Sequence, residues 1–251
     1  MQPSRRIADD LRRAIASGEL AEGAKLPSER VLATQYQTAR NTVRAAVQQL
    51  NEEGLVTVQH GRGAFVRRKR KLLRFGGARY SHRLREDTGL SPYRAEVAKQ
   101  GRTAHVDCTS ITRTVPPPEV ADRLGLRNDD DSVIRRENWY YADDEPVQVG
   151  VTFIPWGIAA GSVLADSADM GRGSLYARFA ELGHTITRTR EEIGARMPTP
   201  SEAERLAIPP GVPVIDVTHT GIDQHREPFE VTIFTMRADL TALDYEMPVE
   251  D

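Results

Sequence analysis

The residues best suited to chemistry in this chain are hydrogen-bond donors gathered within five positions, at Arg40, Asn41, Thr42 and Arg44. A guanidinium presents N–H donors in a planar fork, which matches the oxygens of a phosphate and the two acceptors on a guanine edge. Such a cluster is suited to recognising nucleic acid. Because an isolated group of charges is more often only a solvated surface, the elements that carry these side chains must decide between the two interpretations.

Two short helices joined by a tight turn are predicted to carry this cluster. Ser28 is suited to cap a helix that runs to about Tyr36, because its hydroxyl can accept a free backbone N–H and Pro27 prevents a helix from continuing from upstream. Thr38 is expected to cap a second helix, in which apolar residues recur at intervals of three and four. These residues are Val43, Ala46, Val47 and Leu50. The arrangement predicts a helix-turn-helix with the donor cluster exposed near the start of its recognition helix.

A further helix and a hairpin are predicted on either side of this pair. The upstream helix, which ends near Gly18, has one apolar stripe formed by Ile7, Leu11, Ala14 and Ile15. Downstream, residues 55–58 and 64–66 are typical of strands and flank residues 59–63, where two glycines permit positive φ. A hairpin that follows the recognition helix indicates a wing.

Charge is divided unevenly along the chain. Residues 1–74 hold 15 Lys and Arg against 7 Asp and Glu, a net charge of +8, whereas the remainder holds 19 against 29, a net charge of −10. A basic first part attached to an acidic remainder suits a protein that meets phosphates at one end only. The acidic part also argues against a protein that merely coats DNA, because it would repel the duplex.

The order of these signals resembles the winged helix-turn-helix of the GntR family of bacterial transcription regulators. The resemblance covers about the first quarter of the chain and is carried by residues 27–30, 38–44 and 61–66. It implies that the helices contact double-stranded operator DNA through Arg30, Arg40, Asn41, Thr42 and Arg44. It also implies that the wing tip enters the minor groove with His60 and Gly61, beside which lies Arg62.

Beyond residue 80 the pattern predicts strands that alternate with short helices. Strands are expected over residues 103–114, 133–141, 147–154, 185–197, 214–222 and 227–237, and helices over residues 119–126, 173–182 and 201–207. Hairpin-linked strands predict an α+β domain with a mainly antiparallel sheet, one face of which is covered by helices. We expect a DNA-binding domain over residues 1–68, a linker over 69–79, and an effector-binding and dimerisation domain over 80–251.

This second part resembles the effector-binding UTRA domain of the HutC branch of the GntR family, a fold similar to chorismate lyase. The resemblance runs from about residue 79 to the C-terminus and is carried by residues 144–146, 153–155, 198–203 and 238–239. A small-molecule effector is therefore implied, although the sequence does not identify it.

The resemblance also implies where the effector would bind. Members of the branch that bind sugar phosphates carry two arginines and a glutamate where this chain has Asn138, Tyr140 and Gly150, whereas later polar positions are matched by Ser174, Arg188 and Glu230. Together with Met236, the replaced positions imply a wider and more apolar site that takes a larger, less charged ligand. An ordinary ion pair between Arg188 and Glu230 is the competing interpretation of those two residues.

Catalysis is the second interpretation, because the fold is similar to that of an enzyme. The six histidines show no metal-ligand spacing, no serine lies in a nucleophile elbow, and the neighbours Glu191 and Glu192 face opposite ways on a strand. We therefore expect no catalytic residue, metal or cofactor, and we interpret Cys108 as a structural thiol. A chorismate-lyase-like enzyme domain fused to a DNA-binding head remains the alternative.

The sequence thus predicts a bacterial transcription regulator whose operator affinity is controlled by a small molecule. We expect a repressor and a homodimer, since paired heads match a palindromic site. The chain has no apolar run of membrane-spanning length and no N-terminal signal. It is expected to be cytoplasmic, without a membrane partner, and nucleoid-associated when bound to its operator.

Overall fold

The chain divides into two compact units. The computed structural model describes residues 2–67, 71–127 and 130–247. One unit comprises Met1–Lys71 with Met197–Pro213, and the other comprises Leu72–Arg196 with Val214–Asp251. We call residues 2–67 the head and the second unit the body. In the described part of the chain, no helix is both long enough and apolar enough to cross a membrane.

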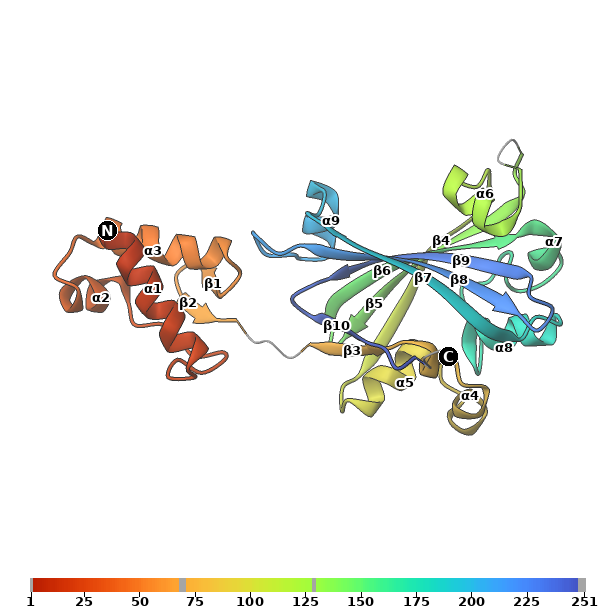
Figure 1. Cartoon of the computed structure of the whole chain (residues 1–251), viewed down its shortest axis with the longest axis horizontal. Helices are drawn as coiled ribbons and strands as arrows, with labels where there is room; N and C mark the ends of the chain where they lie inside the picture. The colour runs from red at the N-terminus through yellow and green to blue at the C-terminus, as the bar shows by residue number, and fades with distance from the viewer. Residues whose placement is uncertain (1, 68–70, 128–129, 248–251) are drawn as a thin grey trace. The chain divides into compact units, whose positions relative to one another are not determined.

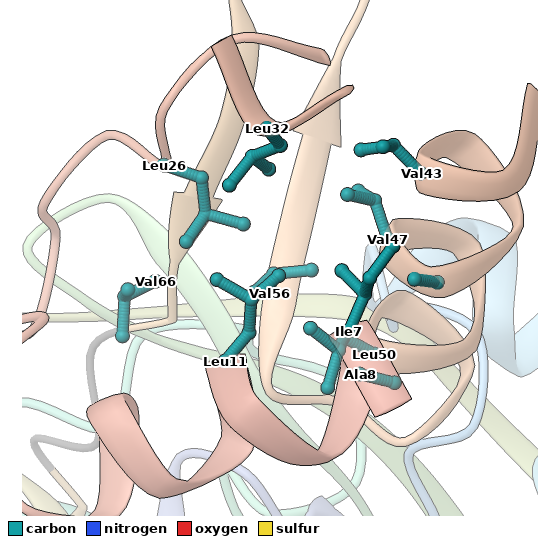
Figure 2. Packing of buried hydrophobic residues seen from close by; sticks show 11 residues of the cluster. Ile7, Ala8, Leu11, Leu26, Leu32, Val43, Val47, Leu50, Val56 and Val66 are labelled. Carbon is teal, nitrogen blue, oxygen red and sulfur yellow. The ribbon is translucent and has the colours of Figure 1, made fainter. Parts of the chain in front are cut away.

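The head is a winged helix-turn-helix, as predicted. It comprises α1 (Pro3–Ala16), α2 (Glu29–Gln35), α3 (Arg40–Glu52) and a hairpin of β1 (Val56–Gln59) with β2 (Gly63–Val66). Its core is made of aliphatic side chains that converge from the helices and the hairpin (Figure 2). The core includes Ile7, Leu11, Leu32, Val43, Val47, Leu50 and Val56. Burial of these side chains supplies the main stabilisation of this small unit.

The turn between α2 and α3 differs in one respect from the prediction. Ser28 does cap α2, since its hydroxyl accepts from the backbone N–H of Val31 at 3.3 Å. Thr38 does not cap α3, however: the N-cap is Ala39, without a side-chain cap. Gln37 adopts a positive φ of 50°, and the chain therefore turns before α3 begins at Arg40.

The body is built on a six-stranded antiparallel sheet, which confirms the predicted architecture (Figure 1). The strand order is β4 (Ala104–Thr114), β5 (Val133–Ala142), β6 (Glu145–Pro155), β9 (Pro228–Arg237), β8 (Val214–Asp223) and β7 (Ile186–Arg196). Hairpins join β5 to β6 and β8 to β9, and β7 lies at an edge.

Helices pack on both faces of this sheet, so the expected single helical layer is wrong. Neighbouring residues of a strand point to opposite faces. Val133 and Phe153 pack with α6 (Pro118–Leu124). The adjacent Ile134 and Ile154 pack instead with the segment that holds α7 (Trp156–Ala159) and α8 (Ser174–Glu181). Both faces of β5 and β6 carry apolar side chains, and each face therefore needs a cover.

Part of the expected linker has regular structure. Within residues 69–79, β3 (Leu72–Phe75) pairs in parallel with β10 (Thr241–Asp244), and a 3-10 helix covers Gly77–Tyr80. Residues 68–70 lie outside the described part of the chain. The pairing joins segments far apart in sequence, so no local sequence pattern predicts it. Three short helices complete the described elements: α4 (His82–Thr88), α5 (Pro92–Lys99) and α9 (Pro200–Arg205).

Candidate DNA-binding surface and effector cavity

The head exposes all but one of the residues expected to contact DNA, and the exception, Thr42, is half-buried. Arg40, Asn41 and Thr42 occupy the first turn of α3, with Arg44 just beyond them. Arg30 is exposed on α2. The turn between β1 and β2 holds His60, Gly61 and Arg62, all exposed, with a positive φ of 72° at Gly61. The fold thus gathers the predicted DNA contacts on α2, on the start of α3 and on the wing tip.

Arg44 is held by a residue that the sequence interpretation did not include. Its Nε donates to Oε1 of Glu29 at 3.0 Å and its Nη2 to Oε2 at 2.8 Å. The hydrogen bond from Arg44 lowers the pKa of Glu29, so the carboxylate stays ionised at neutral pH. A bidentate pair of this kind fixes the direction of the guanidinium. Glu29 is the first residue of α2, so this ion pair joins the start of α2 to the second turn of α3.

The body contains a cavity of about 480 Å³, within the roughly 300–1,000 Å³ typical of ligand pockets. The sheet face that carries Asn138 and Tyr140 forms one wall, and Ser174 at the start of α8 contributes to another. The structure therefore brings three of the seven expected effector residues to one cavity. Residues of the 3-10 helix and of α5 also line it, and the sequence interpretation missed them.

The other four expected effector residues are not among those that line this cavity. Gly150 lies behind its wall, where a Cβ would stand 2.9 Å from the Phe234 ring. Glu230 and Met236 are fully buried. Arg188 is exposed on the edge strand β7, next to a register shift between residues 186 and 188. Nor do Arg188 and Glu230 oppose each other, since Arg188 pairs in register with Ile222.

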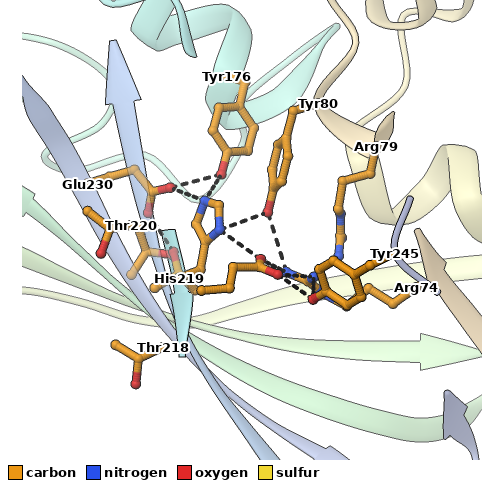
Figure 3. A network of polar contacts seen from close by, with 12 residues as sticks. Arg74, Arg79, Tyr80, Tyr176, Thr218, His219, Thr220, Glu230 and Tyr245 are labelled. Carbon is orange, nitrogen blue, oxygen red and sulfur yellow. Dashed lines mark hydrogen bonds and ion pairs between the residues drawn. The ribbon is translucent and has the colours of Figure 1, made fainter. Parts of the chain in front are cut away.

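A buried polar network lies behind the cavity and is centred on His219 (Figure 3). His219 is fully buried, with Nδ1 2.9 Å from Oε1 of Glu191 and Nε2 2.9 Å from Oε1 of Glu230. The hydroxyl of Tyr176 donates to Glu230 at 2.9 Å. Arg74 on β3 donates to Glu191 from two nitrogens, at 2.6 and 3.0 Å. The network thus connects β3 to three strands of the sheet and to α8.

The network is charged. Burial would lower the pKa of His219, but the charge of Glu230 and the hydrogen bond to Glu191 raise it above its ordinary value. Burial would raise the pKa of Glu191, but hydrogen bonds from His219 and Arg74 lower it strongly. Because both ring nitrogens face carboxylates, His219 serves both only as an imidazolium. The sequence interpretation missed this cluster because its members come from separate strands.

Two tyrosines connect the network to the cavity. Tyr80 and Tyr176 both line the cavity, and their rings meet edge to face with centroids 5.1 Å apart. The Tyr80 hydroxyl lies 3.3 Å from Nδ1 of His219, and burial raises the pKa of Tyr80 to about 12. In Figure 3 both hydroxyls point toward the His219 ring. A molecule in the cavity would therefore contact side chains that belong to the network.

The described residues show no group of three or more His, Cys, Asp or Glu that could hold a metal. Glu191 and Glu192 face opposite ways, as expected: Glu191 points into the network, whereas Glu192 pairs with Arg123 at 2.7 Å. Cys108 is partly buried and has no disulfide partner, and its Sγ lies 3.8 Å from Nη2 of Arg136.

Comparison with known proteins agrees with this two-part architecture. Residues 3–66 match the family of bacterial regulatory proteins known as the gntR family, and residues 99–242 match the UTRA domain. The HTH-type transcriptional regulator GgaR of Escherichia coli is 29% identical over 94% of this chain and 87% of its own. The regulator Rv0792c of Mycobacterium tuberculosis is 28% identical over 98% and 86%.

Solved structures show the same fold. PhnF from Mycobacterium smegmatis, 24% identical, superposes with a TM-score of 0.61 over 97% of this chain and all of its own. A GntR-family transcriptional regulator, 23% identical, gives 0.64 over 99% and 98%. The chain is a DNA-binding transcription regulator with a ligand-binding C-terminal domain, and it belongs to the gntR family of bacterial regulatory proteins that carry a UTRA domain.

Proposed function

We propose that this protein is a homodimeric repressor whose effector binds in the cavity of the body and alters operator affinity. The observation that carries the proposal is the polar network behind the cavity. It runs from Tyr80 and Tyr176 in the cavity wall to Arg74 on β3, which is the first strand of the body. An effector that prefers one arrangement of this network shifts the DNA-binding equilibrium by the difference in its two affinities.

Operator contacts are proposed for both helices and for the wing. Arg40 or Arg44 reads a guanine edge, and Arg30 and Thr42 bind phosphate or a base edge. Asn41 and the wing residues 60–62 complete the footprint. A dimer would place two heads on half-sites separated by multiples of one helical turn, roughly 10–10.5 base pairs.

The body is proposed to bind its ligand without converting it. His219, the residue best suited to proton transfer, is fully buried and is not among the lining residues. A chorismate-lyase-like activity would appear as consumption of a ligand on incubation with the purified chain. The proposed role requires recovery of the ligand unchanged.

The proposal is tested by operator binding with and without effector. The operator is selected from genomic fragments with the full chain, and the complex is then treated with a deproteinised small-molecule extract of the host. The extract should release the wild type. Asn138→Phe, which places a ring in the cavity, should bind the operator but respond weakly to the extract. Thr189→Phe, the same kind of change on the exposed edge strand, is the matched control and should respond normally.

If Asn138→Phe still responds to the extract like the wild type, the effector does not bind in this cavity. Molar mass from light scattering tests the dimer separately, since a monomer at micromolar concentration that also binds single half-sites would contradict it.

A further inference from the structure

Arg79 is a buried cation with unused hydrogen-bond donors in the cavity wall. It lies in the 3-10 helix Gly77–Tyr80, its relative exposure is 6%, and it lines the cavity. Its Nη2 lies 3.2 Å from Oε2 of Glu96. Its Nε and Nη1 are buried without a hydrogen-bond partner among the described residues. Native proteins rarely leave buried donors unsatisfied, because each costs free energy that a partner would recover.

Arg136 is a second buried cation in the same wall. Its relative exposure is 1%, and it donates to two neutral acceptors, the carbonyl oxygens of Leu164 and Ser167, both at 2.7 Å. No ion pair joins it to a carboxylate in the part of the chain that the structure describes. The carboxylate of Asp166 acts on Arg136 only at a distance, and Asp166 is exposed. The charge of Arg136 is therefore hydrogen-bonded but has no buried carboxylate in contact, although buried charges are ordinarily paired.

The other buried charges near the cavity balance one another. Arg74 faces Glu191, Arg79 faces Glu96, and His219 faces Glu230. This leaves Arg136 without a buried carboxylate in contact among the described residues. Two carboxylates also line the cavity, but Asp107 is about half exposed beside His105 and Asp169 is exposed, so both lie toward solvent. The interior of the cavity is thus positive, which favours an anion.

Aromatic side chains form much of the remaining wall. The rings of Tyr93 and Tyr140 meet edge to face with centroids 5.0 Å apart, and Phe234 lies 6.2 Å from Tyr140. The Tyr93 hydroxyl is buried without a partner among the described residues, which adds one more free polar group to the wall. Together with Tyr80 and Tyr176, these rings suit a planar apolar group packed face or edge on.

We propose that the ligand is a small organic anion with a planar apolar body, of the aromatic carboxylate class, and that Arg79 anchors its carboxylate. The inference rests on the proposed function, since it takes this cavity as the effector site. Arg79 supplies two free donors to the anion, the charge of Arg136 completes the balance, and the tyrosines and Phe234 hold the planar part. Glu96 positions Arg79, because its Oε1 also accepts from the backbone N–H of Phe75 at 2.8 Å.

The test uses the full chain and titration calorimetry. Benzoate, phenylacetate and indole-3-acetate are each compared with the corresponding primary amide, which has nearly the same shape but no charge. Glucosamine 6-phosphate serves as an anion without a planar apolar body. At least one carboxylate should bind, at least tenfold more tightly than its amide and than the sugar phosphate.

Variants assign the anchor. Arg79→Gln should weaken the preferred carboxylate at least tenfold while leaving the amide unchanged, and Arg79→Lys should retain part of the preference. Arg79→Gln/Glu96→Gln removes both charges of the pair and covers the case in which the single change unfolds the body. Arg190→Ala is the matched control, an exposed arginine of the same unit that has no assigned role in the site, and should bind like the wild type.

Three results would overturn the inference: equal binding of acid and amide, normal acid binding by both Arg79→Gln variants, or no binding of any carboxylate to the folded wild type. Operator affinity is measured in parallel. A carboxylate that binds through Arg79 without changing operator affinity leaves the ligand class standing and contradicts the proposed function. If amides also release the operator, the proposed function stands and the ligand class is contradicted.

Discussion

The head and the body place their charges in opposite ways. In the head, ion pairs such as Arg44–Glu29 and Arg12–Glu53 lie at the surface around an aliphatic core. In the body, several charged side chains are buried, none of them more than 6% exposed: Arg74, Arg79, Glu96, Arg136, His219 and Glu230. The head keeps its charges available for DNA. The body holds them inside, where a bound ligand can alter their balance.

This difference separates binding from stability. Surface ion pairs contribute about 0–1 kcal/mol, whereas removing one partner of a buried pair costs about 3–5 kcal/mol because the other charge is left uncompensated. Charge changes in the head should therefore affect DNA binding and leave stability nearly unchanged. Charge changes in the body should affect stability first.

The largest expected effect comes from the centre of the network. His219→Leu leaves Glu191 and Glu230 buried without the cation between them, and should lower the free energy of unfolding of the body by about 3–5 kcal/mol. Both tryptophans, Trp139 and Trp156, belong to the body, so their fluorescence during urea unfolding follows this unit alone. His219→Gln, whose amide can still form hydrogen bonds, should lower this free energy of unfolding by less. A loss below 1 kcal/mol for both variants would contradict the contrast between the units.

The free energy of unfolding of the body should depend on pH because of the same network. This change should be smaller than the loss caused by His219→Leu. The pKa of His219 is raised in the folded state, so its contribution is complete below the ordinary value of about 6.5 and is lost as the pH rises through the folded pKa. The pKa of Glu191 is lowered, so its contribution is present above about 4.5 and is lost as the pH falls through the folded value.

The body should therefore be most stable between about pH 4.5 and 6.5, as far as these two groups decide it. Urea unfolding followed by tryptophan fluorescence from pH 4 to 9 measures this. In His219→Gln the decline above pH 6.5 should flatten. An unchanged decline in that variant would assign the pH dependence to other groups.

The next effect concerns base reading in the head. If Arg44 reads a guanine edge, Arg44→Ala should weaken the operator about 5- to 150-fold per half-site and relax specificity at one base pair. Arg40→Ala tests the other candidate in the same way. Affinities are measured over a set of operators that each carry one altered base pair. Equal weakening on every operator would mean that the arginine binds phosphate instead.

The head and the body also differ in how much of their structure the sequence could predict. The head was foreseen almost completely, because its signals are local: the Ser28 cap, the three-and-four spacing from Val43 to Leu50 and the hairpin around Gly61. Its one error, the cap at Thr38, arose because a positive φ at Gln37 delays the helix.

The sheet of the body was also predicted, and three of the seven expected effector residues line its cavity, but the buried network behind the cavity was not predicted. Strands can be recognised by local composition, whereas the cavity depends on which strands become neighbours. Arg74 and Glu191 are 117 residues apart, and their contact requires both the β3–β10 pairing and the position of β7 in the sheet. Arg188 was expected in the site because it aligned with a polar position, but it is exposed on β7, which the strand order places at the edge of the sheet.

The smallest expected effect concerns the wing. Arg62 is exposed in the turn between β1 and β2, and its guanidinium lies 5.9 Å from the centre of the Phe65 ring. If it neutralises one phosphate, Arg62→Ala should weaken all DNA sequences alike and reduce the slope of log affinity against log salt by about 0.9. Arg83→Ala, which removes an exposed arginine of the acidic body, should leave the slope unchanged.

These slopes are measured with the full chain on the operator and on unrelated DNA between about 50 and 200 mM salt, the range over which released counterions dominate affinity. Weakening that appears on the operator alone would mean that Arg62 reads the width or the bases of the minor groove. A change of slope with Arg83→Ala would mean that the body also contacts phosphates. The separation of DNA binding in the head from ligand binding in the body would then fail, because charge on both units would set operator affinity.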